Sequence, residues 1–169
     1  CAFVESAEEP TILKLRVISR NQQLIRLDME KPFARSSAPR IADAADALMA
    51  DAGVVVLSDY RKNTLSDVRS LIGLARRHGR PVLVDPKGDD YLRYRGATVL
   101  TPNRSEFRQV AGSWKNEGEL TRKAHALRRR LQVDALLITR SEEGMTLYRD
   151  GERFHVPAQA REVFDVSGA

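Results

Sequence analysis

The sequence predicts an α/β fold with a doubly wound, mainly parallel sheet that is flanked by helices. Three observations lead to this fold class. Short apolar runs, typical of strands buried on both faces, recur along the chain. Segments with helical periodicity separate most of these runs, and such alternation favours parallel pairing. Towards the end, two strand-like segments joined by Asp150-Gly151 indicate an antiparallel hairpin at the sheet edge.

The first part of the chain has a different pattern from the rest. In residues 11–29, Leu13, Leu15 and Val17 alternate with charged residues, so two extended segments are expected on either side of residues 20–22. Residues 31–40 contain two prolines and two serines, which indicates a connector. The apolar spacing from residue 41 to 52 predicts a helix.

Strands and helices alternate from there on. The apolar runs predict core strands at residues 54–57, 82–84, 98–100 and 135–138. Helical periodicity predicts helices from about residue 64 to Gly79, at 104–111 and at 119–131. The edge hairpin is expected at residues 145–149 and 153–157. The length of 169 residues is consistent with one domain.

Composition and charge limit the kinds of ligand and cellular location that are expected for the chain. The net charge of +5 and the pI of about 9.7 admit anionic ligands. The basic residues are mostly interleaved with apolar helix positions, which favours a solvated face over a nucleic-acid-binding stripe, so no nucleic-acid partner is predicted. No apolar run could span a bilayer, and no signal-peptide pattern is found. The single cysteine fits a reducing compartment, so a cytoplasmic location without membrane attachment is predicted.

Both ends have the character of internal sequence. The chain opens at Cys1 and closes inside a glycine turn at residues 167–169. We interpret it as part of a longer polypeptide.

Polar residues and turn formers follow each of the four predicted core strands. These segments are residues 58–60, 85–88, 101–106 and 139–144. In an open parallel sheet the carboxyl ends of the strands lie at one edge, and ligands bind there. The sequence therefore predicts one polar cleft that is suited to phosphate and metal.

Each candidate also has a structural interpretation. Asn103 and Glu106 can share a helix face and hold magnesium and phosphate, or they can form a capping box. Lys87 can neutralise a transferring phosphoryl group, or it can be an exposed surface lysine. Residues 165–169 can bind an anion where a turn opens onto a helix, or they can be an ordinary glycine turn.

Several other kinds of site lack their patterns. The sequence has neither GxGxxG nor GxxxxGK[ST], so dinucleotide-binding and P-loop sites are not indicated. His78, His125 and His155 are isolated and lack metal-ligand spacing.

An ordered set of motifs resembles the ribokinase-like, phosphofructokinase-B-type sugar kinases. The set is N-x-x-E at 103–106, T-R-x-x-x-G at 139–144 and D-x-[ST]-G-A at 165–169. Within that family, five blocks resemble the heptose 7-phosphate kinases, and the likeness covers essentially the whole chain. The blocks are SRNQQLIRLD (19–28), LSDYRK (57–62), VDPKG (84–88), RYRGATVLTPNRSEF (93–107) and TRSEEGMTL (139–147).

The resemblance implies a ribokinase-like fold and a carbohydrate kinase. Such an enzyme would use ATP and Mg²⁺, with K⁺ as a further cation in several relatives. It would phosphorylate the anomeric hydroxyl of D-glycero-D-manno-heptose 7-phosphate to the 1,7-bisphosphate, for the lipopolysaccharide core. In many bacteria such a kinase is the amino-terminal half of a bifunctional kinase and adenylyltransferase. The resemblance also implies a homodimer, with residues 11–29 as a lid or a dimer strand.

The resemblance assigns roles to individual positions. The general-base aspartate is expected directly beyond Ala169, after a further glycine, and Gly168 and Ala169 belong to the anion hole. Asp165 would hold a monovalent cation, and Asn103 and Glu106 would hold Mg²⁺. The implied ATP-binding residues are Asn103, Arg104, Ser105, Glu106, Lys87, Thr139, Arg140 and Gly144. The implied sugar-binding residues are Asp59, Tyr60 and Lys62.

The chain departs from the family pattern at several points. Asn63 stands where the family has glycine, and the part of the family domain that carries the first strands and much of the sugar pocket is missing. As a 169-residue polypeptide, the chain is expected to be inactive. Two alternatives stay open: a kinase for fructose phosphate, tagatose phosphate or ribose, and a non-catalytic nucleotide- or nucleic-acid-binding α/β module.

Overall fold

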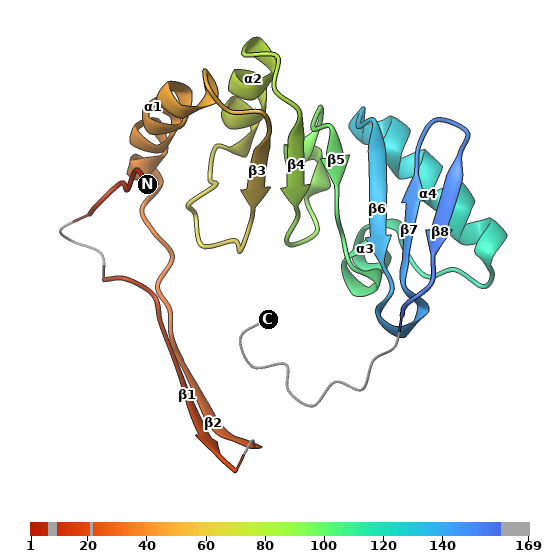
Figure 1. Cartoon of the computed structure of the whole chain (residues 1–169), viewed down its shortest axis with the longest axis horizontal. Helices are drawn as coiled ribbons and strands as arrows, with labels where there is room; N and C mark the ends of the chain where they lie inside the picture. The colour runs from red at the N-terminus through yellow and green to blue at the C-terminus, as the bar shows by residue number, and fades with distance from the viewer. Residues whose placement is uncertain (7–9, 21, 160–169) are drawn as a thin grey trace.

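A six-stranded sheet in the order β3-β4-β5-β6-β7-β8 forms the centre of the computed structural model, which describes residues 1–6, 10–20 and 22–159 (Figure 1). The strands β3 to β6 are parallel, and β7 and β8 continue the sheet as an antiparallel edge hairpin. Their bounds are Val55–Ser58, Val82–Asp85, Val99–Leu100, Ala135–Thr139, Met145–Tyr148 and Arg153–Val156.

Among the described residues, four α-helices and three 3-10 helices connect the strands. The α-helices are α1 (Ala38–Met49), α2 (Val68–Arg77), α3 (Arg104–Ala111) and α4 (Glu117–Leu131). The 3-10 helices are η1 (Arg35–Ser37), η2 (Tyr91–Tyr94) and η3 (Ser141–Glu143). Within the residues that the structure describes, no helix is both long enough and apolar enough to cross a lipid bilayer.

One face of the sheet carries the core. Leu57, Val84, Leu100 and Leu136 follow one another across the paired strands, and all are buried. Helices α2 and α4 pack against this layer and against η2, which lies between them. The apolar runs of the sequence therefore supply a continuous core under these helices.

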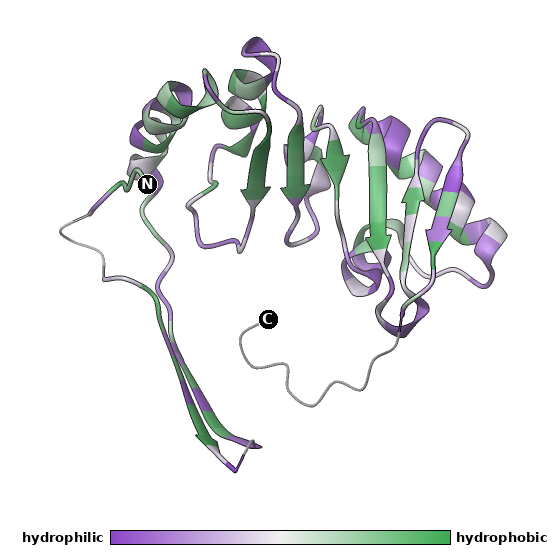
Figure 2. Ribbon diagram, viewed as in Figure 1, coloured by the Kyte–Doolittle hydropathy of each residue, from purple (hydrophilic) through white to green (hydrophobic). Residues whose placement is uncertain are grey.

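The opposite face is less covered by the described residues. Val56 is 65% exposed, and its neighbours across the sheet, Leu83 and Val99, are half-buried. The expectation that these runs are buried on both faces is therefore wrong for β3 and only partly met at β4 and β5, whereas the consecutive residues Ala135 and Leu136 of β6 are both buried. Figure 2 shows that β3 and β4 are apolar along their length. This is the pattern of a sheet built to carry a second helical layer.

Strands β1 (Leu13–Ser19) and β2 (Gln22–Met29) form a separate antiparallel hairpin that projects from the main body (Figure 1). The two strands that the alternation in residues 11–29 predicts are confirmed. Every side chain that the structure describes in these strands is exposed. The hairpin therefore has no core of its own.

The predicted elements are all present, and their ends differ most at α2. The sequence predicts a start near residue 64, but the helix begins at Val68, so that boundary is wrong. Asn63 adopts a left-handed φ of 68°, and the Asp67 side chain caps the helix by accepting a hydrogen bond from Ser70 N at 3.3 Å. A capping aspartate is a stronger start signal than the apolar spacing before it. Helix α1 also begins earlier than expected, at Ala38, with a proline in its first turn.

Candidate functional site

The segments after β3, β4, β5 and β6 lie along one edge of the sheet, as the sequence predicts for parallel strands. Backbone hydrogen bonds join neighbouring segments beyond the strands. Asp59 N donates to Asp85 O at 3.0 Å, and Thr139 N donates to Pro102 O at 3.1 Å. An isolated parallel bridge also pairs Asn103 with Thr139. The polar edge is thus a continuous structure rather than four independent loops.

Asn103 and Glu106 form both halves of a capping box at the start of α3. Glu106 N donates to Asn103 Oδ1 at 2.9 Å, and Asn103 N donates to Glu106 Oε2 at 3.0 Å. The Glu106 side chain is largely buried. The structural interpretation of this motif is confirmed, and it leaves Glu106 Oε1 directed at a second partner.

That partner is Lys87. Its Nζ lies 2.8 Å from Glu106 Oε1, so Lys87 is drawn to the polar edge although it remains exposed. The hydrogen bond and charge of Glu106 raise the pKa of Lys87. The ammonium group is therefore charged at neutral pH, as a group that binds phosphate must be.

Asp85, at the end of β4, adds a second carboxylate to the region. Partial burial, followed by the charge of Glu106, raises the pKa of Asp85. Ser58 Oγ donates to Asp85 Oδ2 at 3.4 Å. Two carboxylates that repel each other attract a divalent cation, so the donor set fits Mg²⁺. Asp85 is not among the site residues predicted from the sequence, although its position directly after an apolar run is a signal for it.

A buried network joins the segment after β3 to the segment after β4. The Tyr94 hydroxyl donates to Asp59 Oδ2 at 2.7 Å and accepts from Lys87 N at 3.2 Å. Asp59 Oδ1 accepts from Arg61 N at 2.7 Å, and Arg93 approaches Oδ2 at 3.6 Å. Asp59 is only 4% exposed, and burial raises the pKa of Tyr94. Tyr94 is not predicted from the sequence, because it lies in η2, an element without a periodic signal.

The other two candidate sugar-binding residues lie at the base of the β1–β2 hairpin. Glu30 pairs with Lys62 and, at 3.2 Å, with Lys14. Lys14 Nζ also lies 5.9 Å from the centroid of the Tyr60 ring. The structure therefore brings Tyr60 and Lys62 close to the segment for which the family resemblance implies a lid or a dimer strand.

Arg140 is held in a charged network at the other end of the edge. Its guanidinium donates to Glu117 at 2.5 and 2.9 Å and also pairs with Glu143, and the side chain is buried. The guanidinium lowers the pKa of both carboxyl groups. Arg104 pairs with Glu143, and Arg153 reaches Glu117 at 2.8 Å. Arg140 thus ties the end of β6 to the start of α4.

The remaining candidates are placed as follows. Ser105 is exposed in the first turn of α3, and Thr139 ends β6. Gly144 has a φ of +86° and lies against the chain just after β8. Asp165, Gly168 and Ala169 lie outside the described residues. No cluster of three or more His, Cys, Asp or Glu side chains suited to a metal ion occurs in the described part of the chain.

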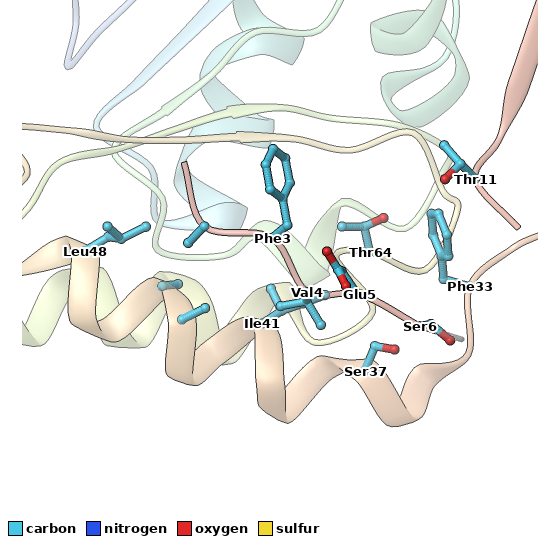
Figure 3. A pocket seen from close by; sticks show the side chains of 13 residues that line it. Phe3, Val4, Glu5, Ser6, Thr11, Phe33, Ser37, Ile41, Leu48 and Thr64 are labelled. Carbon is cyan, nitrogen blue, oxygen red and sulfur yellow. The ribbon is translucent and has the colours of Figure 1, made fainter. Parts of the chain in front are cut away.

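One cavity lies away from this polar edge. It measures about 730 Å³ and is bounded by the first residues of the chain, Phe33, Thr64 and helix α1 (Figure 3). Its lining is mostly apolar and includes none of the predicted site residues. A second cavity, of about 320 Å³, is polar and includes Asp59.

The family resemblance is confirmed by comparison with known proteins. The sequence profile of the pfkB family carbohydrate kinases matches residues 1–169. The chain is 53% identical over 170 residues to the bifunctional protein HldE of Aeromonas hydrophila and 52% identical over 167 residues to the D-beta-D-heptose 7-phosphate kinase of Bordetella bronchiseptica. The alignments cover 100% and 99% of this chain but 36% and 53% of the two relatives. The chain thus spans between about a third and about half of the length of these relatives.

A solved structure shows the fold. Arabidopsis thaliana ribokinase, complexed with ribose and ATP, aligns with a TM-score of 0.61 and 20% sequence identity. The alignment covers 72% of this chain and 40% of that chain. The expected ribokinase-like α/β fold is therefore confirmed.

Proposed function

The chain belongs to the pfkB family of carbohydrate kinases, and we propose that the protein containing it phosphorylates D-glycero-D-manno-heptose 7-phosphate at the anomeric hydroxyl, with ATP as donor. The observation that carries the proposal is the identity of 52% to a D-beta-D-heptose 7-phosphate kinase along 99% of this chain. Under this proposal the chain is part of one kinase domain, and residues 11–29 are its lid.

Phosphoryl transfer needs positioning and charge stabilisation more than covalent chemistry from the protein. Mg²⁺ bound with ATP would neutralise charge that develops on the phosphate oxygens. Glu106, together with Asp85, would hold this ion, since the charge of Glu106 already raises the pKa of Asp85. Lys87 would contact the phosphoryl group, because its ammonium lies at the same edge and stays charged.

The other residues would position the two substrates. The segment after β6, with Thr139, Arg140 and Gly144, would flank the nucleotide together with Asn103, Arg104 and Ser105. Arg140 would act there by fixing the backbone, because its guanidinium is occupied by carboxylates. Asp59, Tyr60 and Lys62 would face the sugar, with the hairpin above them. We expect the general base directly beyond Ala169, the anion hole at Gly168 and Ala169, and a K⁺ site at Asp165.

We also propose that the protein forms a homodimer through the β1–β2 hairpin. Three cross-strand pairs put apolar side chains on one face of the hairpin: Leu13 with Met29, Leu15 with Leu27, and Val17 with Ile25. All six are between 40% and 58% exposed. A two-stranded hairpin is marginally stable alone in water, so we expect another apolar surface to pack against this face. The hairpin of a second copy offers a matching apolar surface.

The function is tested with the full-length protein by measuring ADP release with ATP and Mg²⁺. We expect release with heptose 7-phosphate and little with fructose 6-phosphate. Release with fructose 6-phosphate alone would keep the family and overturn the substrate. The absence of release with both, from a protein that is folded and binds ADP, would overturn the proposed kinase activity.

A further inference from the structure

A second cluster of basic side chains lies beside the candidate site and has no role in the mechanism above. Arg35, Arg61 and Arg93 come from η1, the segment after β3 and η2, and they converge on the polar cavity of about 320 Å³. The other lining residues are Asp59, Asn63, Leu65, Ser66 and Asp90. Segments distant in sequence thus place three guanidinium groups around one cavity.

Two of these guanidinium groups are available to a ligand. Neither Arg35 nor Arg61 forms an ion pair with a residue that the structure describes. The Arg93 guanidinium already has partners within the protein, since it donates to Leu65 O, approaches Asp59 and lies over the Tyr94 ring. The positive charge of Arg35 and Arg61 is therefore not neutralised by a fixed partner in the described part of the chain.

The acidic residues of the lining do not cancel this charge. Asp59 is already satisfied by the Tyr94 hydroxyl, Arg61 N and Arg93. Asp90 is exposed and opposes the two free arginines with a single charge. Ser66 Oγ is buried and has no hydrogen-bond partner among the described residues.

We propose that this cavity binds a phosphate group. Guanidinium groups present parallel N–H donors that match two oxygens of one phosphate. The cavity is large enough for a phosphate with part of the molecule that carries it. The proposal does not depend on the proposed kinase activity.

The position of Arg61 connects the cavity to the candidate phosphoryl site. Its side chain lies against Gly88, next to Lys87 in sequence, and a Cβ on Gly88 would lie 3.0 Å from Arg61 Cζ. Asp59 belongs to both the cavity and the Tyr94 network. The ligand can therefore be the phosphate of the sugar substrate or a free phosphate ion, and the chemistry of the cavity is the same for both.

The test is calorimetric binding of inorganic phosphate to the full-length protein, without ATP, at an ionic strength held constant with potassium chloride. We expect Arg35→Gln and Arg61→Gln each to weaken binding about tenfold, because each removes a charge-assisted hydrogen bond. Asp90→Asn should tighten binding, and Arg129→Gln on the exposed side of α4 should leave it unchanged. Arg61→Lys, which keeps the charge but loses the paired donors, should fall between the wild type and Arg61→Gln.

Competition identifies the source of the phosphate. If heptose 7-phosphate displaces inorganic phosphate, and Arg61→Gln raises KM for the sugar but not for ATP, the cavity holds the substrate's own phosphate. If phosphate stays bound at saturating sugar, the cavity is a separate phosphate site. Phosphate binding that both arginine variants leave intact and that ADP abolishes would place the ion in the nucleotide site and refute the proposal. So would the absence of binding above the chloride control.

Discussion

Lys87 Nζ lies 2.8 Å from Glu106 Oε1, so a candidate phosphate-binding cation and a candidate metal-binding carboxylate neutralise each other. The second oxygen of the carboxylate is held by the backbone N–H of Asn103 at 3.0 Å. Glu106 therefore connects a helix cap to the candidate phosphoryl site. A metal ion at Oε1 would compete with Lys87, and this would free the ammonium for a phosphate oxygen.

The two interpretations of Glu106, as a cap and as a metal ligand, are separated by Glu106→Gln in the full-length protein. Glutamine can still accept the hydrogen bond from Asn103 N, so the cap survives and Tm should change little. The lost charge should raise the Mg²⁺ concentration required for half-maximal activity and lower kcat at least tenfold. Asn103→Ala is the matched variant for the cap and should cost about 1 kcal/mol of stability. Unchanged kinetics for Glu106→Gln would leave only the capping role.

The sequence predicts the sheet well because each strand or turn is specified by a short pattern of neighbouring residues. The apolar run at residues 82–84 and the Asp-Gly turn at 150–151 each specify one element, and β4 and the β7–β8 hairpin lie there. The direction of the parallel strands then places the polar segments at one edge. Asn103 and Glu106 are three residues apart, so their capping geometry also follows from the sequence alone.

The partners within the site depend on tertiary contacts that no local pattern contains. Lys87 and Glu106 are 19 residues apart, and Tyr94 meets Asp59 across 35 residues. Arg140 is a candidate nucleotide ligand from its motif, but its guanidinium pairs with Glu117 at the start of α4. The packing of η2 and α4 determines which charged groups form ion pairs. Sequence periodicity does not predict this packing.

Gly144 is a position where the backbone requires glycine. Its φ is +86°, and a Cβ there would lie 2.1 Å from Val156 O, a backbone atom that cannot turn aside. Gly144→Ala should therefore lose more than about 2 kcal/mol in the free energy of unfolding, from left-handed strain together with the clash. Gly151→Ala, with a φ of +70° and no atom within 4 Å, should lose about 1 kcal/mol from strain alone.

Gly53→Ala is the matched control for both effects, since Gly53 lacks a positive φ and has no atom within 4 Å. It should leave the urea midpoint nearly unchanged. Equal losses for Gly144→Ala and Gly151→Ala would mean that the chain after β8 moves away without cost.

Asp85 gives the stability a defined pH dependence. Its pKa is raised in the folded state, first by burial and then by Glu106, so the folded protein holds this proton more tightly than the unfolded chain. The resulting stabilisation is present at low pH and is lost as the pH rises from about 3.8, the ordinary pKa of the group, through the folded-state value. At neutral pH the ionised Asp85 therefore destabilises the fold.

Asp85→Asn should accordingly increase stability at pH 7 and have no such effect below pH 4, as measured by urea unfolding across the range. The gain should stay below about 1 kcal/mol, because the carboxyl group is still partly solvated. Addition of Mg²⁺ should reduce the difference if the ion relieves the repulsion between Asp85 and Glu106. A variant that is less stable than the wild type at neutral pH would show that the Ser58 hydrogen bond outweighs the burial of charge.

The apolar face of the β1–β2 hairpin predicts how the full-length protein associates. Leu15 and Leu27 are directly paired across the strands, and they are 45% and 48% exposed. Replacing both with glutamine should weaken a hairpin-mediated dimer at least tenfold, since each buried leucine contributes about 1.5–3 kcal/mol. Arg16→Gln is the matched control, because it changes the same strand on the opposite face. Light scattering over a concentration series measures the association. A wild-type protein that stays monomeric at tens of micromolar, or a glutamine pair that leaves the dimer intact, would mean that some other surface covers this hairpin.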